Sequence, residues 1–120
     1  MGLAQSFSRQ SRLLNKHDFG RVFDNNSLKA SGRFALLLAR PTNNHCSRLG
    51  LIVAKKHVRQ AVQRNRIKRL VREFFRHQQH ANTSIDVVFL ARSNIDTLTN
   101  SDIEKQLEAL WRKLQAQTQR

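Results

Sequence analysis

The sequence predicts an α+β fold, an α/β sandwich in which three helices pack on a small mixed four-stranded sheet. Two segments, 59–77 and 101–114, repeat apolar residues at helical spacing, and the run 85–91 is almost entirely apolar and has the length of a strand. Three further strand-like segments precede the first of these helices. A chain of 120 residues fits one domain. The predicted element order is therefore αβββαβα, with the helices packed on the sheet.

The chain begins with a polar segment and a short predicted helix. Residues 1–12 are rich in Ser, Gln and Arg and show no sustained period, which predicts a flexible arm. Phe19, Val22 and Phe23 stand at i, i+3 and i+4, the spacing of one helix face. Asn25 marks the expected end of this first helix.

Three strands are expected next. A short strand over 28–30 is followed by a turn and a longer strand over 33–40, which Pro41 closes. The segment 48–56 alternates apolar residues in the manner of a third strand. We predict that this third strand pairs antiparallel with its predecessor in the sequence.

The second half of the chain predicts a helix over 59–77, a strand and a final helix. The strand 85–91 is apolar on both faces, which predicts a central position in the sheet. Ser101 and Glu104 have the spacing of a capping box and predict the start of the final helix. Residues 115–120 are rich in Gln and are expected to form a flexible tail.

The helix over 59–77 carries the highest positive charge density of the chain. Between Lys55 and Arg76 there are nine Lys or Arg residues and one acid, Glu73. Helical geometry places an apolar stripe on one face: Ile67, Leu70, Val71 and Phe74. It places a polar and cationic stripe on the opposite face: Asn65, Lys68, Arg69, Arg72 and Arg76. Because like charges four residues apart destabilise an isolated helix by about 0.2–0.5 kcal/mol per pair, this pattern favours an anionic partner.

The overall composition indicates the same class of partner. A net charge of +14 and a pI near 11.7 produce strong self-repulsion, which a polyanion such as nucleic acid relieves. The alternatives are an anionic membrane surface, an acidic protein or DNA, although no helix-turn-helix or zinc-finger spacing is found. No secretory signal, membrane-spanning stretch or cysteine pair is found, so we expect a soluble cytoplasmic protein with no membrane partner.

The residues that could carry out chemistry are poorly arranged for it. The eight Asp and Glu residues are scattered, in no pattern that pairs an acid with a base or binds a metal. His77 and His80 lack a third ligand, and Cys46 beside His45 has no orienting group nearby in the sequence. We therefore predict no catalytic residue and no metal site on this chain.

Several blocks of the sequence, in order, resemble the protein subunits of bacterial ribonuclease P. The most specific is the Arg-Asn-Arg motif at residues 64–66 within the segment 61–70. The segments 19–23, 49–56 and 86–92 also match, and the resemblance extends from about residue 13 to residue 114.

This resemblance implies a cytoplasmic ribonucleoprotein, an endoribonuclease in which a large catalytic RNA cuts the 5′ leader from precursor tRNA. The chain is then the auxiliary subunit, whose partners are the catalytic RNA and the leader of precursor tRNA, with no protein partner implied. It assists the RNA and broadens its substrate range. The magnesium that the holoenzyme requires belongs to the RNA, and we expect no cofactor bound by the chain itself. The family fold also implies a left-handed βαβ crossover through the basic helix.

The resemblance also assigns roles to residues. The expected RNA-binding positions are Lys55, Lys56, Arg59, Arg64, Asn65, Arg66, Lys68, Arg69 and Arg72. The expected leader-binding cleft, between the first helix and one face of the sheet, consists of Phe19, Phe23, Ala35 and Leu37. The family often has an aromatic residue at the position of Leu37, and this chain has no Tyr, so we expect apolar contact there instead of stacking.

Two other functions remain open from the sequence. One is a structural RNA-binding protein of another ribonucleoprotein, such as the ribosome. The other is a nuclease that acts without an RNA subunit.

Overall fold

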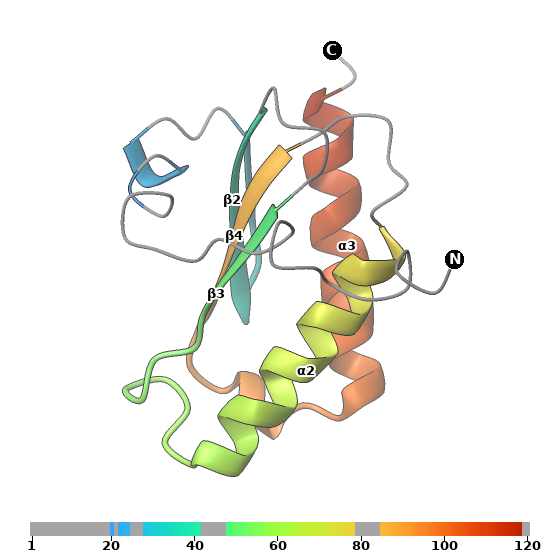
Figure 1. Cartoon of the computed structure of the whole chain (residues 1–120). Coiled ribbons are helices and arrows are strands. Elements are labelled where there is room, and N and C mark those ends of the chain that lie inside the picture. Colours follow the sequence, from blue (N-terminus) through green and yellow to red (C-terminus); the bar gives the residue numbers. More distant parts are fainter. Residues whose placement is uncertain (1–19, 21, 25–27, 42–47, 79–84, 119–120) are drawn as a thin grey trace, which may run out of the picture.

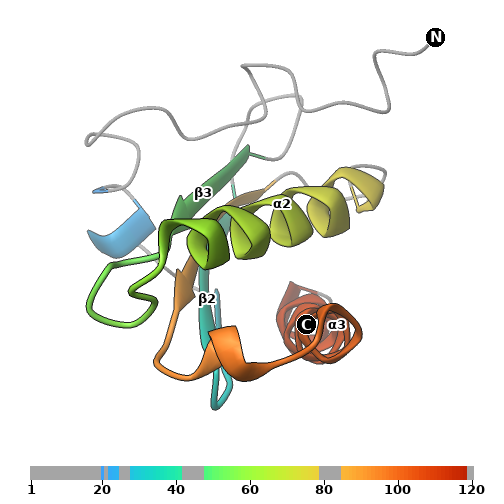
Figure 2. The ribbon, with the colours of Figure 1, turned by 90° about the horizontal axis from the view of Figure 1, so that it is seen from below.

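The computed structural model describes residues 20, 22–24, 28–41, 48–78 and 85–118. Their core is a four-stranded sheet with two long helices on one face and the helical residues 20 and 22–24 on the other (Figures 1 and 2). The strands are β1 (Leu28–Ser31), β2 (Ala35–Pro41), β3 (Arg48–Ile52) and β4 (Ile85–Ala91). The helices are α2 (Ala61–His77) and α3 (Asn100–Thr118), with a short 3-10 helix, η3 (Ile95–Thr97), before α3. This confirms the predicted α+β fold class.

The strands are arranged in the order β1-β2-β4-β3. Strand β2 pairs antiparallel with both β1 and β4, whereas β3 pairs parallel with β4. The predicted antiparallel pair of β2 with β3 is wrong, because β4 lies between them. Strand β4 takes this central place because all of its residues except Leu90 are buried, and both of its faces are covered.

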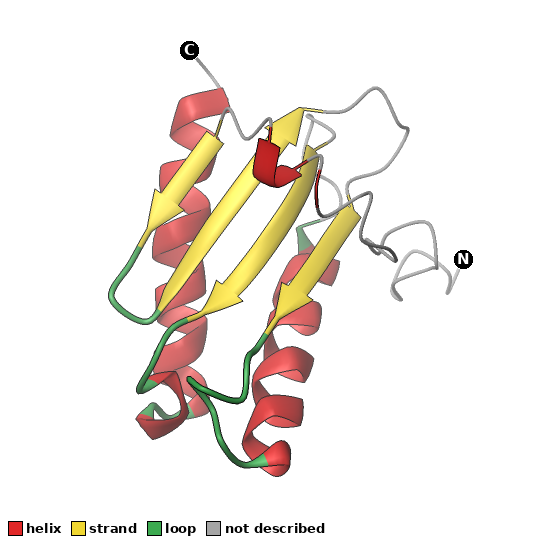
Figure 3. Cartoon of the chain, turned by 90° about the vertical axis from the view of Figure 1, so that its left-hand side faces the viewer, coloured by secondary structure: helices red, strands yellow, loops and turns green. Residues whose placement is uncertain are grey.

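The parallel pair requires a crossover, and helix α2 provides it. In Figure 3, which shows the sheet from the face opposite the long helices, β3 is the right-hand strand and runs downward. Helix α2 returns behind the sheet, and β4 lies to the left of β3. The β3–α2–β4 crossover is therefore left-handed, as the family resemblance implied. About 98% of such connections are right-handed, so sequence patterns alone do not predict this one.

The main hydrophobic core lies between the sheet and the two long helices. Helix α2 contributes the buried residues Ile67, Val71 and Phe75. Phe74, which the sequence assigned to the apolar stripe, is half-buried and packs against this core. Helix α3 contributes five buried residues: Ile103, Leu107, Leu110, Trp111 and Leu114. The rings of Phe75 and Trp111 meet edge to face, with centroids 5.2 Å apart, which joins the two helices above the sheet.

Helix α3 differs from its prediction at both ends. It begins at Asn100, and the backbone N–H of Asp102 donates to the hydroxyl of Thr99 at 3.1 Å, so Thr99 is the capping residue and the predicted cap at Ser101 is wrong. At the other end the helix continues to Thr118, although a flexible tail was predicted from residue 115. The Gln117 side chain bonds both the N–H and the C=O of Lys29, at 3.1 and 2.6 Å, so pairing with the edge strand β1 anchors this end.

One carboxylate is buried in the sheet. Asp86 in β4 is 2% exposed, and the Arg48 guanidinium donates to both of its oxygens at 2.9 and 2.7 Å. The two residues stand opposite each other in the parallel register of β3 and β4. This bidentate pair satisfies the buried charge and joins the edge strand to the central one.

The predicted arm over 1–12 falls outside the described residues. Within the residues that are described, no helix is both long and apolar enough to span a bilayer.

Candidate nucleic-acid interface

Helix α2 and the loop before it present a cationic surface. We call the following seven residues the basic surface: Lys55, Lys56, Arg59, Asn65, Lys68, Arg69 and Arg72. All are exposed except Lys68, which is half-buried. None of these seven side chains forms a hydrogen bond or ion pair with another residue in the described part of the chain. Their charge is thus left for a partner, because the buried stripe of α2 faces the sheet and α3.

Arg64 holds the loop that carries part of the basic surface against the start of α2. Its guanidinium donates to the carbonyl oxygens of Val58 and Arg59, at 3.1 and 2.7 Å, and so folds the preceding loop onto the start of α2. The first turn of α2 contains no acidic residue, and Gln60 makes no side-chain cap. The positive end of the helix dipole is therefore not compensated by the protein, which adds to the positive potential around Arg59.

The loop is also held at its other side. His57 Nδ1 lies 2.7 Å from the hydroxyl of Ser93, which follows β4. The basic loop is therefore attached to the sheet as well as to α2.

Arg66, the second arginine of the Arg-Asn-Arg motif, forms hydrogen bonds with other residues of the protein. Its guanidinium donates to the side chains of Gln63 and Asn100, at 2.8 and 2.6 Å. It also donates to the carbonyl oxygens of Asp96 and Leu98, at 3.3 and 3.2 Å. Arg66 thus joins α2 to η3 and the start of α3, a structural role that its predicted part in RNA binding did not include. Sequence spacing cannot reveal this, because three of the four acceptors lie 30 to 34 residues away.

The last turn of α2 is less cationic than the sequence indicated. Arg76 donates to Glu73 at 2.5 Å, and His77 Nε2 lies 4.0 Å from the same carboxylate. The predicted cationic stripe therefore ends at Arg72.

A second, apolar surface lies on the opposite face of the sheet. Val22, Leu38 and Val88 form a small buried cluster there, and three half-buried side chains pack against it: Leu36, Ile52 and Leu90. Phe23, on the helical segment over this face, is 41% exposed. We call the four partly exposed residues Phe23, Leu36, Ile52 and Leu90 the apolar face.

Two residues predicted to line the cleft are on the wrong face of the sheet. Ala35 and Leu37 are 3% and 0% exposed and belong to the main core under the long helices. Because side chains alternate along a strand, a shift of one residue moves the whole set to the other face. The residues of β2 that face the first helix are Leu36 and Leu38. Phe19 lies outside the described residues.

The apolar face includes residues that the sequence did not single out. Register places Leu90 beside Leu36 and Val88 beside Leu38. The only indication in the sequence was the apolar run 85–91, which predicts that both faces of β4 are covered. Among the described residues, no group of three or more His, Cys, Asp or Glu side chains has the geometry to bind a metal. His45, Cys46 and His80 lie outside them.

The family model and the curated proteins that match this sequence agree with each other. Residues 7–115 match the family model described as Ribonuclease P. The ribonuclease P protein component of Chromohalobacter salexigens is 45% identical over 111 residues, which covers 92% of this chain and 87% of that protein. The corresponding protein of Pseudoalteromonas translucida is 47% identical over 109 residues, covering 91% and 77%.

Solved structures of similar proteins share the fold. The structure of the Staphylococcus aureus RNase P protein matches with a TM-score of 0.78 and 27% identity, over 85% of this chain and 93% of that one. That of the Thermotoga maritima RNase P protein, in complex with 1-(4-fluorophenyl)-2-thiourea, matches with a TM-score of 0.72 and 27% identity, over 82% and 96%.

Proposed function

The chain belongs to the ribonuclease P protein family, and on this premise we propose how its two surfaces contribute to the removal of the 5′ leader from precursor tRNA. As the protein component, it is the auxiliary subunit of the ribonuclease P holoenzyme and associates with the ribonuclease P RNA. This relationship supports tRNA processing over the ribosomal alternative.

We propose that the basic surface contacts the catalytic RNA and its junction with the substrate. The observation that carries this proposal is the absence, among the described residues, of protein partners for its seven side chains, six of which are cationic. Arginine predominates on α2, and its planar guanidinium matches the geometry of a phosphate. Arg64 and Arg66 support the surface by holding the loop and α2 in place, and their side-chain donors are not counted among the RNA contacts.

The apolar face is the proposed binding site for the single-stranded leader. The half-exposed ring of Phe23 offers a surface on which an unpaired base can stack, and such stacking contributes about 1–3 kcal/mol per base with little dependence on sequence. Leu36, Ile52 and Leu90 add half-buried apolar side chains on the same face of the sheet. This assignment replaces Ala35 and Leu37, which are buried on the other face.

The chemical step belongs to the RNA subunit in this proposal. The protein reduces the repulsion among catalytic RNA, substrate and leader, and it orders the leader so that magnesium ions bound by the RNA can act on the scissile phosphate. We place this reaction in the cytoplasm.

Reconstitution of the holoenzyme tests the proposal. At a magnesium concentration too low for the RNA alone, adding this chain should restore cleavage of a precursor tRNA with a leader of several nucleotides. Cleavage by the protein without RNA, or no effect of the protein on the RNA, would contradict it.

The same assay tests the apolar face. Phe23→Ala should lower kcat/KM for the long-leader substrate by about 5- to 150-fold, the equivalent of one lost stacking contact, and should have little effect on a substrate with a one-nucleotide leader. Val62→Ala is the matched control, because Val62 is 75% exposed on α2 and outside both surfaces. An equal loss on both substrates would indicate damage to the fold instead of loss of a leader contact.

A further inference from the structure

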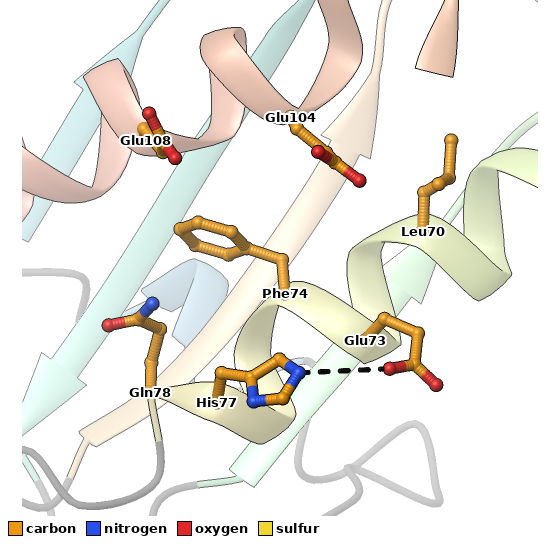
Figure 4. Close-up of a pocket in the computed structure, with 7 residues that line it drawn as sticks. All are labelled: Leu70, Glu73, Phe74, His77, Gln78, Glu104 and Glu108. Atoms are coloured by element: carbon orange, nitrogen blue, oxygen red, sulfur yellow. Dashed lines mark ion pairs between the residues drawn. The ribbon is translucent and has the colours of Figure 1, made fainter. Parts of the chain in front are cut away.

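A pocket of about 420 Å³ lies between the two long helices, and none of its lining residues belongs to either proposed RNA surface (Figure 4). Helix α2 contributes Leu70, Glu73, Phe74 and His77, with Gln78 just beyond its end, and helix α3 contributes Glu104 and Glu108. In Figure 4 the Phe74 ring projects from α2 toward the side of α3 that carries Glu104 and Glu108. We call this site the interhelical pocket.

The pocket is acidic on a strongly basic protein. It contains three of the eight acidic residues of the chain, which has 22 Lys and Arg residues. Glu73 is paired with Arg76 and lies beside His77. Glu104 and Glu108 are exposed, and neither forms an ion pair with any residue in the part of the chain that the structure describes. As like charges four residues apart they destabilise α3 slightly, which a cationic partner would reverse.

The floor of the pocket is apolar. Leu70 and Phe74 are half-buried and pack against the edge of the main core. The Phe74 ring meets Phe75 edge to face at 5.3 Å, which holds it in place. A rigid aromatic floor beside two unpaired carboxylates provides an apolar contact and a cation site within one pocket.

From this arrangement we propose that the interhelical pocket docks a basic segment of another protein, one that presents an Arg or Lys beside a bulky apolar side chain. Charge complementarity supports this occupant, because the two unpaired carboxylates attract a cation and repel phosphate. The apolar residue of the segment would lie on Leu70 and Phe74, and its cation would lie near Glu104 and Glu108. The carboxylates disfavour nucleic acid, because they repel its phosphates.

The test uses the full chain and NMR. The tetrapeptide acetyl-Arg-Leu-Phe-Arg-amide is titrated into the ¹⁵N-labelled protein, with acetyl-Glu-Leu-Phe-Glu-amide and a uridine oligonucleotide as separate probes. We expect the basic peptide to shift the backbone amides of residues 73–78 and 104–108. The other two probes should leave the amides of residues 104–108 unchanged, because these residues lie on α3, which carries no part of the basic surface.

Two variants complete the test. Glu104→Gln/Glu108→Gln should weaken peptide binding by about 2- to 30-fold, since exposed ion pairs contribute about 0.2–1 kcal/mol each. The control Asp24→Asn/Asp102→Asn removes the same charge at exposed positions outside the pocket and should bind as the parent does. The proposal is overturned by equal weakening in both variants, or by shifts of the residue 104–108 amides with the oligonucleotide. Shifts that appear on concentrating the protein alone would likewise overturn it, because they would identify a second copy of the chain as the occupant.

Discussion

At the scale of single residues, the arginines of helix α2 have different surroundings. Arg64 and Arg66 donate to acceptors within the protein, whereas the side chains of Arg69 and Arg72 are exposed and bond no side chain or backbone group of the described residues. A guanidinium carries five donors, so a single arginine can bond several acceptors on different elements. Some arginines of α2 therefore hold the basic surface in shape, and others supply the charges that it presents.

Substitution of Arg66 and Arg69 separates these two roles. Arg66→Ala should lower the free energy of unfolding by about 1–3 kcal/mol, because it removes donors from the partly buried carbonyls of Asp96 and Leu98. Arg69→Ala should change stability by less than about 0.5 kcal/mol but weaken RNA binding, and reduce the slope of log affinity against log salt by about 0.7–0.9. Urea denaturation and RNA binding at several salt concentrations measure both quantities. An unchanged stability of Arg66→Ala would show that its bonds contribute nothing to the fold.

At the scale of elements, the start of α3 shows how local context selects a cap. Thr99 and Ser101 both have hydroxyl side chains, and Ser101 has an acid three residues later. The structure uses Thr99, since η3 leads directly into α3 and the N–H of Ile103 also bonds the Thr99 carbonyl at 3.0 Å. The chain path before the helix, which the sequence pattern does not contain, decides which residue has the non-helical geometry of a cap.

Two alanine substitutions test this assignment. Thr99→Ala should cost about 1 kcal/mol of stability, because the N–H of Asp102 loses its acceptor. Ser101→Ala should be neutral to within about 0.5 kcal/mol, since Ser101 is exposed inside the first turn. Thermal denaturation compares the two, with a Tm lower by several degrees expected only for Thr99→Ala. A greater loss from Ser101→Ala would restore the sequence-based cap.

At the scale of the whole molecule, charge is distributed unevenly over the helical layer. The net charge of +14 is concentrated at the loop before α2 and along α2, while the interhelical pocket is acidic. Self-repulsion of the cationic side lowers the stability of the isolated protein, and a bound polyanion relieves it. Stability and RNA binding are therefore coupled.

This coupling predicts a salt-dependent stabilisation by RNA. At a free concentration of catalytic RNA 100 times its Kd, the folded protein should gain about 2.7 kcal/mol, which corresponds to an increase in Tm of roughly 10–20 °C. The gain should fall steeply between about 50 and 200 mM salt, as phosphate contacts weaken, and the Arg69→Ala/Arg72→Ala variant should gain less. Thermal unfolding of the protein with and without RNA provides the measurement. A gain that does not change with salt would show that the basic surface is not the site of binding.

The amino-acid sequence by itself determined the local features of this protein. Spacing along the chain predicted helix α2, the apolar strand β4 and the concentration of positive charge on α2. The Arg-Asn-Arg motif is read directly from the sequence. The reason is that helical and strand periodicity are set by neighbouring residues.

Only the tertiary structure decided which elements and side chains meet. It placed β4 between β2 and β3, buried Leu37 instead of Leu36 under the long helices, and directed Arg66 to acceptors on η3 and α3. These outcomes depend on strand order, on register and on contacts between residues 30 or more positions apart. Periodicity along one segment contains no information about its partner, and a register error of one residue reverses the two faces of a strand.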